Sequence, residues 1–124
     1  MNGLNYFEIQ VNNPEQAITF YSNVFGWQFT KLDMPIHYWL IQTDGLHGGL
    51  LKRPIPLTKE ASGANAFVSS VEVENFDSIA QSIIQAGGSI VLAKFPVTGK
   101  CWQGYFSDTE GNTFGIYQVD SKAK

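Results

Sequence analysis

Residues 7–27 read FEIQVNNPEQAITFYSNVFGW, and this stretch decides the fold. Apolar and polar residues alternate from Tyr6 to Val11, which predicts a strand with one apolar and one polar face. Asn13 is suited to cap a helix that begins at Pro14 and repeats apolar residues every three or four positions. Gly26 is expected to end this helix, because glycine readily adopts a left-handed backbone conformation. A strand and a helix are therefore predicted in direct succession.

The same arrangement recurs 62 positions further along the chain. Val11 aligns with Val73, Asn13 with Asn75 and Gly26 with Gly88, and FDSIAQSIIQAG supplies a second helical pattern. A repeat of this kind indicates two copies of one supersecondary unit that bury their open faces against each other.

Three more strands are predicted after the first helix and three after the second. The expected strands of the first half are 6–11, 27–32, 37–43 and 48–52, and those of the second half are 67–73, 89–94, 102–107 and 113–119. The predicted fold class is α+β, a single domain (1–124) of two tandem βαβββ modules. Module 1 spans 1–53, the linker 54–63 and module 2 64–120. Together the modules are expected to form a curved, cupped mixed sheet with the helices on the outside.

Composition narrows the possible partners. The chain has 124 residues, 44% of them hydrophobic and 15% charged, which favours a globular domain. The net charge is −3 and the largest basic cluster is Lys52–Arg53, so neither nucleic acid nor a membrane is an expected partner. A single cysteine, Cys101, and an N-terminus without the pattern of a secretion signal favour a cytoplasmic protein.

The paired modules resemble the vicinal-oxygen-chelate superfamily, which includes glyoxalase I, extradiol dioxygenases and bleomycin- or fosfomycin-resistance proteins. FEIQVNNPEQAITFYSNVFGW is similar to the strand, Asx-Pro turn and helix end of that family, and GYFSDTEGNTFGIYQ (104–118) is similar to its "DPEGN" hairpin and final strand. The resemblance implies a cupped sheet that often holds a divalent metal. The family's ligands are His, Glu or Gln from the first and last strand of each module.

The positions that the resemblance assigns to the metal ligands carry unsuitable side chains. They are Tyr6, Val68 and Gly115, while the fourth, near 48–52 and beside His47, cannot be placed. Valine and glycine have no donor atom, and neutral tyrosine is a poor ligand for the usual ions. We therefore expect no cofactor and no metal at the family positions. A divalent metal on Glu8, His47 and Glu72 remains chemically possible.

Glu8 is the candidate catalytic residue, because a desolvated carboxylate in the cup could act as a general base. The alternative is a carboxylate that pairs with a lysine or bonds across the sheet.

The candidate ligand-binding residues are Tyr6, Trp39, Glu72, Trp102 and Tyr117, whose aromatic members could stack on a flat organic molecule. Packing in the core or in a dimer interface is the alternative for these aromatic residues. Phe20, Phe25, Phe67, Phe106 and Phe114 are expected in the core.

These observations lead to three hypotheses. The leading one is a metal-free, small-molecule-binding protein of the glyoxalase/bleomycin-resistance type, with a small organic molecule as its partner. The alternative is a glyoxalase-like lyase or isomerase, or a dioxygenase-related enzyme, with a rebuilt metal site. A structural or regulatory domain with a closed cup is the third. A homodimer, with or without exchanged modules, is expected in each case.

Overall fold

The computed structural model describes residues 5–53 and 68–124. It divides into two compact units, Met1–Lys59 and Glu60–Lys124, and each is described by itself. The predicted linker 54–63 and Phe67, predicted to lie in the core, are outside the described residues.

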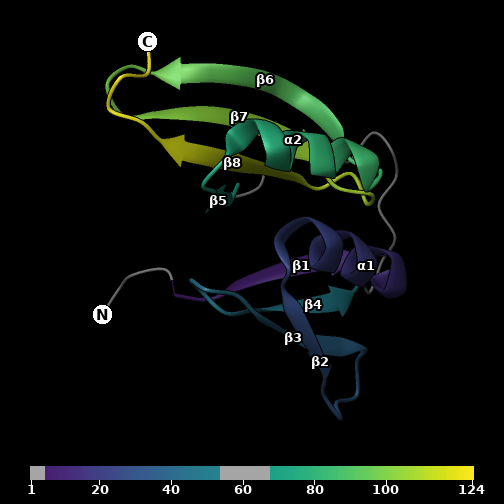
Figure 1. The fold of residues 1–124 in the computed structure, drawn as a ribbon. Coiled ribbons are helices and arrows are strands. Elements are labelled where there is room, and N and C mark those ends of the chain that lie inside the picture. The colour runs from purple at the N-terminus through teal and green to yellow at the C-terminus, as the bar shows by residue number, and fades with distance from the viewer. Residues whose placement is uncertain (1–4, 54–67) are drawn as a thin grey trace. The chain divides into compact units, whose positions relative to one another are not determined.

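Unit 1 has the predicted βαβββ order (Figure 1). Its elements are β1 (Phe7–Val11), α1 (Pro14–Phe25), β2 (Gln28–Lys31), β3 (Tyr38–Gln42) and β4 (Gly48–Lys52). The strands form one mixed sheet in the order β1-β4-β3-β2, in which β1 runs parallel to β4 and the other neighbours are antiparallel. The first strand of the unit therefore lies beside its last, which brings residues about forty positions apart into contact.

Helix α1 begins and ends where the sequence predicts. The Asn13 side chain accepts a hydrogen bond from the backbone N–H of Gln16 at 3.1 Å, which satisfies a donor that the first turn leaves open. Gly26 adopts φ 71° and donates its N–H to the Ser22 carbonyl at 2.9 Å. The helix then packs on the sheet through Ala17, which is buried with Val11, Ile41 and Leu50.

Unit 2 repeats the order (Figure 1). Its elements are β5 (Ser70–Glu72), α2 (Phe76–Gln85), β6 (Ser89–Val97), β7 (Cys101–Ser107) and β8 (Thr113–Val119). The sheet order is β5-β8-β7-β6, with β5 parallel to β8 and the rest antiparallel. Asn75 caps α2 by accepting the N–H of Ser78 at 3.0 Å. Both modules are thus α+β units around a four-stranded mixed sheet.

Strand β6 is longer than the predicted 89–94, because it continues to Val97. Its pairing with β7 shifts register between Ile90 and Leu92 and again between Leu92 and Phe95. Such bulges let an irregular edge strand stay paired, and an edge strand also tolerates Pro96. Alternation within a short window cannot reveal a strand interrupted in this way.

Each sheet has one face covered by its own helix and one helix-free face. In unit 1, Val11, Ile41 and Leu50 define the covered face by packing with Ala17. In unit 2, the ring of Phe76 in α2 lies 6.1 Å from that of Phe106 in β7. The helix-free face of unit 1 is formed by Tyr6, Glu8, Tyr38, Leu40, Gly49 and Leu51, and that of unit 2 by Ser70, Glu72, Gln103, Tyr105, Gly115 and Tyr117.

Within the described residues, neither helix is both long and apolar enough to cross a membrane.

Candidate ligand-binding site

The helix-free face of unit 1 carries a chain of three polar side chains. Tyr38, on β3, donates its hydroxyl hydrogen to Oε2 of Glu8, on β1, at 2.8 Å. The hydroxyl of Tyr6 lies 2.6 Å from that of Tyr38. Because a phenol has one hydrogen to donate and Tyr38 gives its own to Glu8, Tyr6 must be the donor in this second bond. The chain therefore runs from Tyr6 through Tyr38 to the carboxylate.

Burial of Tyr38 and the geometry of this chain change its acidity. Tyr38 is only 7% exposed, whereas Glu8 and Tyr6 are exposed. Burial, the hydrogen bonds with Tyr6 and Glu8, and the negative charge of Glu8 all raise the pKa of Tyr38 above its ordinary value. Tyr38 thus remains a neutral donor at neutral pH and holds the Glu8 carboxylate in one position.

Gly49 makes this chain possible. It pairs with Glu8 on one side and with Leu40 on the other, so it lies in the middle of the helix-free face. A Cβ atom at Gly49 would overlap the hydroxyl of Tyr38 and would lie 2.8 Å from its Cε1 atom. Tyr38 therefore crosses β4 through the space that the missing side chain leaves, and reaches Glu8 two strands away.

Unit 2 contains a corresponding crossing, in which a side chain of one strand passes over a glycine of the next strand to reach the strand beyond. Gly115 on β8 pairs with Ser70 of β5, and Gln103 on β7 reaches over it to place Nε2 3.2 Å from the Ser70 Oγ atom. A Cβ atom at Gly115 would lie 2.7 Å from the Gln103 amide nitrogen and would also collide with Ser70 Oγ. The two crossings are related by the repeat, because Tyr38, Gly49 and Glu8 occupy the same places in their sheet as Gln103, Gly115 and Ser70 do in theirs.

Glu72 and Tyr117 lie beside that crossing. Tyr117 pairs with Glu72 across β5 and β8 and donates its hydroxyl to Glu72 Oε1 at 3.3 Å. Burial, followed by the charge of Glu72 and the hydrogen bond to it, raises the pKa of Tyr117. Each helix-free face therefore presents one carboxylate that a tyrosine of its own sheet holds.

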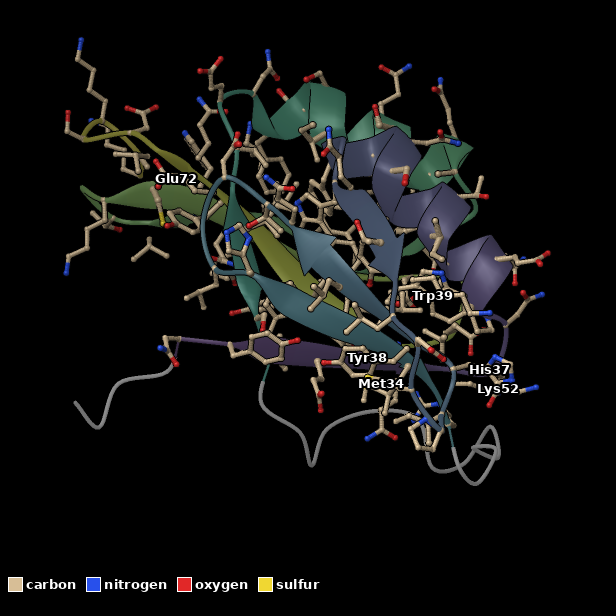
Figure 2. The ribbon with its side chains drawn as sticks, turned by 90° about the horizontal axis from the view of Figure 1, so that it is seen from below. Met34, His37, Tyr38, Trp39, Lys52 and Glu72 are labelled. Carbon is tan, nitrogen blue, oxygen red and sulfur yellow. The ribbon has the colours of Figure 1, made fainter. Side chains whose placement is uncertain are left out.

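Trp39 and Trp102 were predicted to bind a ligand in the cup. The structure places both on the covered faces of their sheets and not on the helix-free faces. Trp39 follows Tyr38 in β3 and so points the opposite way, into the cluster around Ala17, and Lys31 lies 5.6 Å from the centre of its ring. Figure 2 shows Tyr38 beside β1 and Trp39 beside α1. The expected position of Trp39 on the cupped face is therefore wrong.

Trp102 lies on the covered face of unit 2 for the same reason of strand alternation. Its Nε1 atom donates to Asp120 Oδ2 at 3.0 Å. The Lys94 ammonium lies 4.9 Å from the centre of the Trp102 ring and 5.5 Å from that of Phe76, a residue of α2. Trp102 thus packs on the same side as the helix and does not join Glu72 and Tyr117.

The residues at the family's metal positions do not fit a metal. The Tyr6 hydroxyl is engaged with Tyr38, Val68 has no donor atom, and the space beside Gly115 is taken by the Gln103 amide. In the alternative set, His47 lies in the turn before β4, and its Nδ1 atom accepts the Thr43 N–H at 3.4 Å. Within the described part of either unit, no three His, Cys, Asp or Glu side chains gather as ligands.

Sequence analysis missed Tyr38, Gly49 and Gln103. Tyr38 belongs to the run YWLIQ, in which four successive apolar or aromatic residues hide the alternation that would assign faces. The expected strand order could have revealed Gly49. If the first and last strands of the module pair in parallel, Glu8 lies opposite this glycine.

The chain is similar to known proteins over most of its length. The model of the family described as "Glyoxalase/Bleomycin resistance protein/Dioxygenase superfamily" matches residues 3–116. Two curated relatives, each called "Putative glyoxylase CFP32", come from Mycobacterium bovis and Mycobacterium tuberculosis. Both are 19% identical over 118 residues, which cover 94% of this chain and 45% of the relative. The chain thus spans less than half the length of these relatives.

Solved structures share the fold. A glyoxalase/bleomycin resistance protein/dioxygenase family enzyme from Burkholderia phytofirmans aligns with a TM-score of 0.73 and 21% identity, covering 94% of this chain and 98% of that one. A fosfomycin resistance protein from Listeria monocytogenes aligns with a TM-score of 0.78 and 15% identity, covering 97% and 93%. A glyoxalase family protein from Bacillus cereus gives 0.78 and 15%, covering 96% and 95%. At these identities the likeness concerns the fold.

Proposed function

Because this chain belongs to the glyoxalase/bleomycin resistance protein/dioxygenase superfamily, we propose that it binds a small organic molecule on its helix-free faces without the family's metal. The observation that carries this proposal is the chain Tyr6–Tyr38–Glu8. Tyr6 stands at one of the positions that the family uses for metal ligands, and here its hydroxyl is hydrogen-bonded to another side chain. A network of this kind orients polar groups of a ligand without needing an ion.

Unit 2 supports the same function. Its helix-free face pairs Glu72 with Tyr117 and adds the stacked rings of Phe95 and Tyr105, whose centres lie 6.3 Å apart. Aromatic rings next to a fixed carboxylate are suited to hold a molecule that has both an apolar and a polar part. Gly115 carries no side chain that could ligate a metal there.

The first test measures metal content. The protein is purified without chelator and analysed for Zn, Ni, Mn and Fe, and the proposal expects less than about a tenth of an equivalent of each. A stoichiometric metal that Glu8→Gln removes would overturn the proposal in favour of a metal enzyme.

The second test measures ligand binding directly. Thermal unfolding is followed with a library of small organic molecules, because a ligand that binds only the folded state at saturating concentration adds a few kcal/mol to the unfolding free energy. Hits are repeated with Tyr6→Phe and Tyr38→Phe. Failure of the whole library to stabilise the protein would count against a binding function and favour a structural role.

A glyoxalase-like lyase or isomerase is the competing function, and one observation favours it. Glu8 is exposed and uses only Oε2 to bond Tyr38, so its other oxygen is free to accept a proton from a substrate. Loss of turnover of a 2-oxoaldehyde–thiol adduct in Glu8→Gln would support this reading. Absence of turnover with added Zn, Ni or Mn would leave the binding function as the better account.

A homodimer is the proposed assembly. The edge strand β6 exposes Ile90, Val91 and Leu92, which are 57%, 56% and 52% exposed. An exposed apolar edge strand promotes aggregation unless another strand or surface covers it. Sedimentation is expected to show a dimer at tens of micromolar that Leu92→Lys weakens, whereas a monomer throughout would remove the proposal.

A further inference from the structure

We propose that the helix-free face of unit 1 selects organic cations, and that Glu8 and Tyr6 bind the protonated amine of a ligand. This inference rests on the proposed binding function and names the chemical class of the ligand. It follows from the direction of the hydrogen bonds, the distribution of charge on the face, and the apolar side chains on the same face as the carboxylate.

The hydrogen-bond chain leaves only acceptors free. Tyr6 donates its hydrogen to Tyr38, and Tyr38 donates its own to Glu8 Oε2. The remaining sites of this chain are the lone pairs of the Tyr6 oxygen and the Oε1 atom of Glu8, and all of them accept. A ligand that bonds here must therefore bring donors, and an ammonium group brings three donors together with a charge opposite to that of Glu8.

The strand positions of this face carry charge of one sign. Among the strand positions of the helix-free face, Glu8 is the only charged side chain. The basic strand residues Lys31 and Lys52 lie at covered-face positions, paired with Trp39 and Val11. Within the described residues, no ion pair involves Glu8, whereas Lys94 and Asp77 form one in unit 2. The Glu8 carboxylate is thus available to a cation from outside.

Apolar side chains lie on the same face as this carboxylate. Leu40 and Glu8 flank Gly49 in one row across the sheet, and Leu40 is 41% exposed. Tyr6 is 45% exposed and offers a ring face to which cations are attracted. Because the Tyr38 hydroxyl fills the space over Gly49, an amine at Glu8 can keep an attached hydrocarbon against Tyr6, with Leu40 beyond Tyr38 on the same face. The face therefore suits an amine that carries an apolar group.

The test compares three probes with the same ring. 2-Phenylethylamine is a cation at pH 7, 2-phenylethanol is neutral and phenylacetate is an anion. Each is titrated into the isotope-labelled chain of 124 residues, and backbone amide shifts of unit 1 report the site and the affinity. The amine is expected to bind about tenfold more tightly than the alcohol, as one charge-assisted hydrogen bond implies, and to perturb residues around Glu8.

Two carboxylate variants complete the test. Glu8→Gln keeps an acceptor for Tyr38 but removes the charge, and is expected to reduce the preference for the amine to less than about twofold. Glu15→Gln removes the same charge from an exposed position in the first turn of α1 and is expected to keep the preference. A preference that survives Glu8→Gln overturns the inference.

The outcomes also separate this inference from the proposed function. If the alcohol or phenylacetate binds this face as tightly as the amine, the selection for cations is refuted while the binding function stands. If none of the three perturbs the face, the inference is refuted, and the library screen decides the binding function on its own.

Discussion

Replacing Gly49 with alanine should break the link between Tyr38 and Glu8. The new Cβ atom would overlap the Tyr38 hydroxyl, so this nearly buried side chain has to leave its position. The hydrogen bond to an ionised acceptor that is lost contributes about 1.5–3 kcal/mol to stability. Exposure of part of the ring costs about 1 kcal/mol more.

An opposing effect reduces this loss. Alanine is favoured over glycine within a strand by about 0.5–1 kcal/mol. The net expectation for Gly49→Ala is therefore a decrease of about 2–3 kcal/mol in the free energy of unfolding. Urea unfolding followed by tryptophan fluorescence measures it, as a midpoint lowered by roughly 1–2 M for a small domain. Gly45→Ala is the matched control, because the nearest atom to its Cβ would be Thr43 Oγ1 at 3.9 Å.

A double-mutant cycle identifies the cause of the loss. In a Tyr38→Ala background the side chain that collides is absent, so adding Gly49→Ala should cost less than about 0.5 kcal/mol. An equal cost in both backgrounds would refute the argument, since the strain would then come from the β4 backbone and not from Tyr38. No cost in the wild type would refute it as well.

Tyr38→Phe should remove an alkaline loss of stability. Because the pKa of Tyr38 is raised, the folded protein keeps the phenolic proton when the unfolded chain releases it near pH 10, so the unfolding free energy falls as pH rises above about 10. Urea titrations at pH 9 and 11 should show a larger loss in the wild type than in the variant, and equal losses would contradict this. Gly115→Ala should break the hydrogen bond that crosses β8 and cost about 1–3 kcal/mol, measured as a lowered urea midpoint; an unchanged midpoint would argue against the crossing. Asn13→Ala and Asn75→Ala each remove a helix cap and should cost about 1 kcal/mol by calorimetry, and a variant of wild-type stability would show that its cap is dispensable.

The features that could be predicted from the sequence depend on neighbouring residues. The cap at Asn13, the stop at Gly26 and the placement of Glu8 on the strand face opposite to Val11 each follow from a few consecutive positions, and all three are confirmed. The family and the βαβββ order could be predicted because two such local patterns follow each other along the chain. Both are confirmed.

The features that were missed depend on register between strands. Trp39 was assigned to the wrong face because its apolar neighbours show no alternation, and burial of Ile41 against α1 decides the face instead. The bond between Tyr38 and Glu8 requires knowing that β4 lies between their strands and has a glycine at the crossing. No local pattern contains that information.

Gly49 and Gly115 impose an order on the substitutions that this chain can accept. A longer side chain at position 115 needs the volume that the Gln103 amide fills, and one at position 49 needs the volume of the Tyr38 hydroxyl. A carboxylate or an imidazole at either glycine can therefore be accepted only after a second substitution. The residue that crosses the glycine from the adjacent strand, Tyr38 or Gln103, must first be replaced by a smaller one. A mutant library that varies either glycine alone would return mostly destabilised variants, whereas one that varies each glycine jointly with its crossing neighbour would open the route to new chemistry on the same scaffold.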